Sequence, residues 1–162
     1  MHAKGFTLIE LVTLLVIVGI IAVFAVGRLD FTSVFEQRGV QDKVKAALQF
    51  ARKAAVAGRR HVCVSTAANR ITLTLDTRLP ETSGAAFCDG SSAANLALPG
   101  PDRQCAAGVT NAVCSSTEAT ISSATATFAF DPQGRSTAAA NVSVAVTGQS
   151  GVIVERGTGY VH

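Results

Sequence analysis

The sequence predicts an α+β fold in which a long N-terminal helix, apolar in its first half and amphipathic in its second, packs on an antiparallel β-sheet. Three observations predict it: an apolar run over residues 6–26, apolar side chains repeated every three or four positions over residues 40–55, and short stretches of alternating apolar and polar residues further on. With 162 residues, the chain has room for one domain beyond the apolar run.

The apolar run from Phe6 to Val26 is 21 residues long. As a helix it would measure about 31 Å, which matches a hydrocarbon core of about 30 Å. We therefore expect residues 6–27 to span a membrane. The alternative is a cleavable secretory signal, since Lys4 is basic and small residues occur near Gly27. A signal normally has about 7–15 apolar residues without an acid, whereas this run is longer and contains Glu10.

Residues 28–60 are predicted to form an amphipathic helix, with Gly58 as the residue that follows its end and with Gly27 and Gly39 as points where it could bend. Its apolar stripe comprises Val40, Val44, Ala47, Leu48, Ala51, Ala54 and Ala55. This segment has eight Lys and Arg against three acidic residues, whereas residues 61–162 have five against seven. A basic face of this kind can contact DNA or anionic lipid, and more often it is only solvated.

Residues 61–162 are predicted to be rich in β-strands. The expected strands are 61–65 and 71–76, which form a hairpin, and then 125–130, 141–147 and 151–156. The sequence DPQG at 131–134 has the preferred residues of a type I turn. Residues 78–123 are rich in Gly, Ser, Ala, Pro and Cys, and we expect a long irregular excursion that forms a variable surface.

The four cysteines all follow the apolar run: Cys63, Cys88, Cys105 and Cys114. An even number in a chain that enters an oxidising compartment indicates disulfides, for which three pairings exist. Cys105 and Cys114 enclose only eight residues, so their local bridge is favoured, and Cys63 with Cys88 would follow. The absence of a CxxC motif disfavours a zinc or thioredoxin-type site.

The sequence shows no catalytic constellation, no metal site and no cofactor-binding motif. His61 lacks an HExxH setting and is expected to be a strand residue, and Asp131 before Pro132 is expected to be a turn residue. The serines have no GxSxG motif around them. We therefore expect a protein that is not an enzyme and binds no cofactor.

The stretch KGFTLIEL at residues 4–11, followed by the apolar run, resembles the N-terminal processing motif of type IV pilins and of the pseudopilins of type II secretion. The resemblance implies a leader of residues 1–5. A membrane aspartyl prepilin peptidase would cut between Gly5 and Phe6 and methylate the new amino group of Phe6. The implied partners are other pilins or pseudopilins, this peptidase, the bacterial inner membrane and the pilus assembly platform, with the outer part periplasmic before assembly.

The C-terminal half resembles the minor pilins of the H-type pseudopilin, fimbrial T and mannose-sensitive haemagglutinin groups. The residues that carry this resemblance are Phe128, Phe130, Pro132, Gly134, Val152, Ile153 and Gly159. It implies a structural subunit that primes, caps or enters a pilus or pseudopilus. Gly27 departs from the family, because many major pilins have a helix-kinking proline there.

Glu10 is the one charge in the apolar run, and a carboxylate within a membrane costs about 2.5–3.5 kcal/mol on insertion scales. We expect it to pair with the Phe6 amine of a neighbouring subunit and so to set the offset between subunits. The alternative is an acid tolerated at the interface. An alternative function is DNA binding, as in some fimbrial T proteins, but the C-terminal end offers only Arg156, beside Glu155.

Overall fold

The computed structural model describes residues 5–26, 31–67, 69–79 and 87–162. The chain divides into two compact units, residues 1–34 and residues 35–162. The described part of the first unit contains helix α1, Leu8–Val26. Gly27, where the sequence predicts a possible bend, lies outside the described residues.

Helix α2, Phe31–Gly58, contributes the helical side of the core. Of the predicted apolar stripe, all members are buried except Ala54, which is half-buried and packs against the same core. The helix continues through Gly39 without interruption. The structure corrects its end by one residue, because Gly58 is the last helical residue and Arg59 adopts the left-handed conformation with φ of 49°. Arg60 N donates to Ala55 O, which is the pattern of a Schellman motif.

Five antiparallel strands form the first sheet. Its order is β3 (Ala93–Asn95), β2 (Arg70–Asp76), β1 (Val62–Ala67) and β6 (Thr127–Phe130), and β4 (Ala112–Cys114) pairs with the other end of β2. The predicted hairpin is present, although its strands extend to Ala67 and Arg70. Asn69 in its tight turn has φ of 59°, a conformation that Asn tolerates well.

The second sheet has three antiparallel strands in the order β5 (Ile121–Ser123), β7 (Val142–Val146) and β8 (Val152–Val154). The C-terminal residues extend it, because Val161 pairs with Val154. The predicted turn at 131–134 is confirmed, since Gly134 N donates to Asp131 O at 2.8 Å. Gly134 has φ of 78°, and a Cβ there would lie 2.9 Å from Val56, so glycine suits both the turn and the contact with α2.

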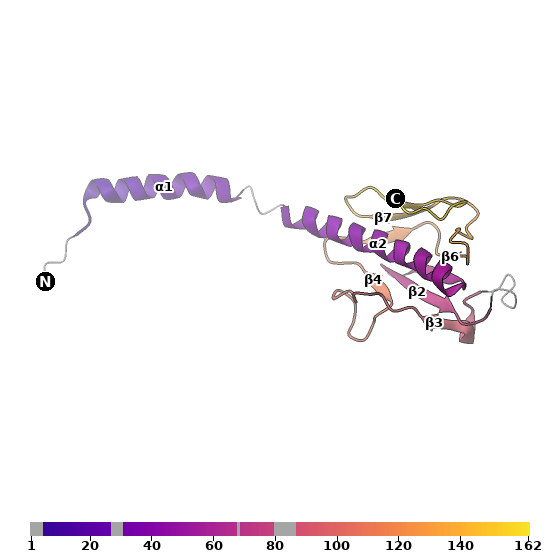
Figure 1. The fold of residues 1–162 in the computed structure, drawn as a ribbon. Helices are drawn as coiled ribbons and strands as arrows, with labels where there is room; N and C mark the ends of the chain where they lie inside the picture. The colour runs from indigo at the N-terminus through magenta and orange to yellow at the C-terminus, as the bar shows by residue number, and fades with distance from the viewer. Residues whose placement is uncertain (1–4, 27–30, 68, 80–86) are drawn as a thin grey trace. The chain divides into compact units, whose positions relative to one another are not determined.

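One core joins the two sheets to α2, which lies across them in Figure 1. The largest fully buried side chains come from all three layers and include Leu48 of α2, Phe130 of β6 in the first sheet and Ile121 of β5 in the second sheet. Alternate residues of β1 and β2 face this core, so Cys63, Thr74 and Asp76 share the opposite face of the sheet. This face carries the first disulfide.

The segment 78–123 is more regular than the sequence predicts. It contains a 3-10 turn (η1, Gly90–Ser92) and the strands β3, β4 and β5, each of three residues. Strands this short do not give a readable alternation, which explains why the sequence predicts an irregular segment. Residues 80–86 of this segment lie outside the described residues.

Candidate functional site

The head of α1 carries the residues that the sequence singles out for processing and assembly. Gly5 and Phe6 precede the helix, and Phe6 is 74% exposed. Thr7 caps the helix, because Glu10 N lies 3.4 Å from Thr7 Oγ1. Glu10 is the third helical residue, so Thr7 and Glu10 occupy the two key positions of a capping box. Lys4 of the motif lies outside the described residues.

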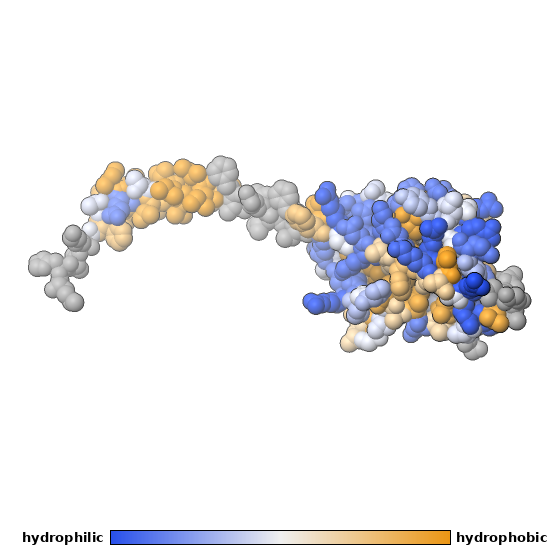
Figure 2. Space-filling view, viewed as in Figure 1, coloured by the Kyte–Doolittle hydropathy of each residue, from blue (hydrophilic) through white to orange (hydrophobic). Residues whose placement is uncertain are grey.

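The side chains of α1 from Leu8 to Val23 are exposed. Hydrophobic residues cover most of the coloured surface of this helix in Figure 2. Within the part of the chain that the structure describes, we find no helix of sufficient length and apolarity to cross a membrane.

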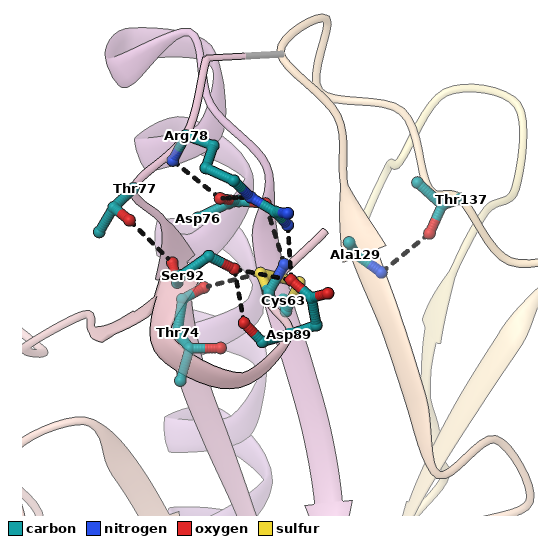
Figure 3. Close-up of a disulfide and its surroundings, with 10 residues drawn as sticks. Cys63, Thr74, Asp76, Thr77, Arg78, Asp89, Ser92, Ala129 and Thr137 are labelled. Carbon is teal, nitrogen blue, oxygen red and sulfur yellow. Dashed lines mark hydrogen bonds and ion pairs between the residues drawn. A yellow bond between two sulfur atoms is a disulfide. The ribbon is translucent and has the colours of Figure 1, made fainter. Parts of the chain in front are cut away.

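The disulfide Cys63–Cys88 joins β1 to the loop before η1, with a Cα–Cα distance of 6.2 Å. Beside it lies Asp76, which is fully buried at the end of β2. Its carboxylate accepts hydrogen bonds from Cys88 N at 2.9 Å and from the main chain and guanidinium of Arg78 (Figure 3). Arg78 also pairs with Asp89 at 2.7 Å. A buried carboxylate therefore holds the loop that contains Cys88.

The disulfide Cys105–Cys114 joins the loop before β4 to the last residue of β4, with a Cα–Cα distance of 5.3 Å. Here the carboxylate is that of Asp102, whose side chain is 3% exposed. It accepts hydrogen bonds from Cys114 N at 3.1 Å and Gln104 N at 3.3 Å, and pairs with Lys43 of α2 at 2.7 Å. The predicted bridge between Cys105 and Cys114, and the pairing of Cys63 with Cys88 that would follow, are both present.

The two aspartates make the stability of the fold depend on pH. Burial raises the pKa of each carboxyl, but the hydrogen bonds to Asp76 from Arg78 and Cys88, and to Asp102 from Lys43 and Cys114, outweigh it. The pKa of each therefore lies below its ordinary value of 3.8. Because a lowered pKa in the folded state stabilises the protein above the unfolded-state pKa, this contribution disappears as pH falls through the lowered values.

We therefore expect the free energy of unfolding to fall as pH decreases below about 5. Urea unfolding of the full chain in detergent, followed by circular dichroism at a series of pH values, measures this. The double variant Asp76→Asn, Asp102→Asn should be less stable at neutral pH and should show a shallower decrease in acid. An equally steep decrease in that variant would assign the acid sensitivity to other carboxyl groups.

The other residues that the sequence analysis weighed have structural contacts. His61 lies immediately before β1, not within it as predicted, and its ring stacks on Phe87 with centroids 4.6 Å apart. Asp131 has the predicted role in a turn, since its carboxylate accepts from Gln133 N and Arg135 N. Among the described residues, no group of three or more His, Cys, Asp or Glu side chains could hold a metal ion.

A cleft of about 250 Å³ lies between α2 and the C-terminal residues. It is lined by Gln49, Arg52, Lys53, Tyr160 and Val161. Arg52 Nε donates to Gly134 O at 3.0 Å, and the ring of Tyr160, a residue 54% exposed, stacks on His162 with centroids 5.4 Å apart. Sequence reasoning missed this cleft, because its cations and its tyrosine are more than 100 residues apart in the chain.

The model of the family "Type II transport protein GspH" matches residues 41–158. The chain belongs to this family. The match confirms the predicted membership among pilins and pseudopilins, and of the three predicted groups it supports the H-type pseudopilins. It begins at Gln41, so the motif at residues 4–11 is a separate observation.

Two solved structures resemble this GspH-family chain, both of the type IV minor pilin FimU from Pseudomonas aeruginosa PAO1. One crystal form has 14% identity and a TM-score of 0.47, and covers 77% of this chain and 90% of FimU. The other has 17% identity and a TM-score of 0.46, and covers 82% and 90%. No curated protein sequence gives a significant match. The GspH family is one of structural pilins and pseudopilins.

Proposed function

We propose that this chain is a minor pilin or pseudopilin that primes, caps or enters a type IV pilus or a type II secretion pseudopilus. The observation that carries the proposal is the GspH match over residues 41–158. The N-terminal motif supports it independently, because Gly5, Phe6 and Glu10 lie together at the exposed head of an apolar helix. The fold adds a compact outer unit with two disulfides, which suits an oxidising compartment.

In this proposal the apolar helix has two successive environments. Before assembly it anchors the chain in the inner membrane as a single pass, with residues 35–162 in the periplasm. The prepilin peptidase removes residues 1–5 and methylates Phe6. During assembly the helix moves into the filament core, where apolar side chains of neighbouring subunits replace lipid. The exposed apolar surface of α1 suits both environments.

Glu10 then acts as the docking residue. The Thr7 cap leaves its carboxylate at the first turn of α1, where the helix dipole favours a negative charge. Processing creates a positive amine at Phe6, four positions before Glu10. In a bundle of parallel helices, an axial offset between neighbours brings the amine of one subunit beside the carboxylate of the next. A buried ion pair of this kind stabilises the contact between subunits only when both charges are present.

Processing is tested by replacing Gly5 with leucine. We expect Gly5→Leu to block the cut, because the bulky side chain occupies the position before the scissile bond, and to leave the full-length precursor in the inner membrane. Intact-mass measurement of protein from membranes gives the result. The matched control Gly19→Leu, within α1, should still be processed. A wild-type mature chain that begins near Arg28 would contradict the pilin proposal and indicate a secretory signal.

A second candidate function is DNA binding, and the cleft beside Tyr160 favours it. Two cations, Arg52 and Lys53, line the same cleft as Tyr160, a residue that is 54% exposed. Cations that contact phosphates and rings that stack on bases are the usual elements of single-stranded DNA binding. Both cations belong to α2 and are distant in the sequence from the C-terminal end, where Arg156 lies beside Glu155.

A mobility-shift assay with labelled single-stranded DNA at rising salt concentration tests this candidate. If DNA binds in the cleft, Lys53→Glu should weaken binding and reduce its salt dependence. The control Lys45→Glu reverses a charge on α2 outside the residues that line the cleft, and its effect should be smaller. Equal effects of both variants would indicate nonspecific attraction to the basic helix.

A further inference from the structure

The two disulfides share an arrangement that their sequence positions do not reveal. In each, the second cysteine of the pair donates its backbone N–H to a buried carboxylate: Cys88 to Asp76 and Cys114 to Asp102. Each carboxylate is also paired with a cation, Arg78 or Lys43. The two disulfides lie in different segments of the chain, so a single shared loop does not account for the repeated arrangement.

Each aspartate also connects to the segment of the first cysteine. Asp102 O accepts from Cys105 N at 3.1 Å, so one residue binds the main chain of both cysteines. Asp76 N donates to His61 O at 2.9 Å, two residues before Cys63. The side chains of Asp76 and Cys63 also share one face of the sheet. Each aspartate therefore connects the two chain segments that carry the cysteines of its own disulfide.

We propose that Asp76 and Asp102 are positioning residues for oxidative folding, which bring each cysteine pair together before the sulfurs are bonded. The contacts involve backbone N–H groups and not sulfur, so they can form while all four cysteines are reduced. At Cys88 the hydrogen bond also supports a left-handed backbone with φ of 55°, a conformation that a non-glycine residue adopts only when its surroundings hold it.

The covalent step needs an oxidant, for which we take a disulfide such as oxidised glutathione. One cysteine thiolate attacks that disulfide and releases one thiol, and the partner cysteine then attacks the mixed disulfide and releases the second. Two protein thiols and one small disulfide thus give one protein disulfide and two small thiols. The second attack is intramolecular, so its rate depends on how closely the two cysteines are held.

The positioning also selects among the three possible pairings. Cys105 and Cys114 are 9 residues apart, and chance contact within so short a loop is frequent. Cys63 and Cys88 are 25 residues apart, so their contact is less frequent without help. We therefore expect the loss of Asp76 to affect its pair more strongly than the loss of Asp102 affects the other pair.

The experiment refolds the reduced full chain in detergent with a glutathione redox buffer. Samples are quenched with acid, alkylated and mapped for disulfide-linked peptides over time. Asp76→Ala should slow the Cys63–Cys88 bond about tenfold, since a hydrogen bond to a charged group is lost, and should increase non-native pairs. Asp102→Ala should slow the Cys105–Cys114 bond. The Asn variants, which keep one acceptor oxygen, should lie between alanine and wild type.

The control is Asp131→Ala. Its carboxylate accepts two backbone N–H groups and pairs with Arg135, as in the other two sites, but its hydrogen-bond partners include no cysteine. It should destabilise a turn without changing the order or pairing of the disulfides. The proposal is overturned if the alanine variants at 76 and 102 form both bonds at the wild-type rate. It is equally overturned if all three alanine variants slow both bonds to the same degree.

Discussion

The Glu10→Gln variant is expected to be processed and inserted normally but to be lost from assembled filaments. Glutamine suits the third position of a capping box as well as glutamate does, so the helix start at Thr7 should persist. Insertion should become easier, because the buried charge is removed. Assembly should fail, because the Phe6 amine of a neighbour then lacks its partner, and breaking one side of a buried pair costs about 3–5 kcal/mol.

Processing is followed by immunoblot, and assembly by recovery in sheared filaments or by crosslinking to other pilins. The control Thr7→Ala removes the cap, at a cost of about 1 kcal/mol, but keeps the charge, so it should assemble better than Glu10→Gln. Normal incorporation of Glu10→Gln would show that the carboxylate is not the docking residue. Loss of processing together with assembly would assign Glu10 to recognition by the peptidase.

The Leu48→Ala variant is expected to lose about 2–5 kcal/mol of folding free energy. Leu48 is fully buried on the face of α2 that packs on the sheets, and its removal leaves a cavity in the one core of the outer unit. Urea unfolding of the full chain in detergent measures the loss. Val56→Ala, at a position 48% exposed on the same helix, should cost about 0.5 kcal/mol or less. If Leu48→Ala lowered the free energy of unfolding as little as Val56→Ala is expected to, the packing of α2 on the sheets would contribute little to stability.

The elements that sequence reasoning predicted best are those with long periodic patterns. The buried stripe of α2 follows from spacings of three and four, and the strands around Cys63, Phe128, Val144 and Val152 follow from alternation. The turn at Asp131 follows from residue preferences alone. In each case the information is local, so neighbouring residues in the sequence suffice.

What the sequence did not reveal depends on residues distant in the chain. Lys43 and Asp102 are 59 positions apart, and nothing near either one indicates the other. The cleft beside Tyr160 is of the same kind. The Thr7 cap is a different case, because Thr-x-x-Glu is a local signal that could have been recognised. The one-residue error at Gly58 arose because glycine is the commonest left-handed residue after a helix, and here arginine takes that place.

The closure of the loop between Cys105 and Cys114 has a consequence for how the surface of this protein can diversify. Both ends of the loop are fixed to Asp102, which is itself held to α2. The exposed residues 106–108 carry no part of the core, whereas Ala112 and Val113, just before Cys114, are buried in it. Each doubling of a flexible loop costs only about 0.6 kcal/mol in closure entropy. The exposed part of this loop, residues 106–108, can therefore be lengthened or replaced, and an antigenic tag can be inserted there, while the sheets beneath keep their register.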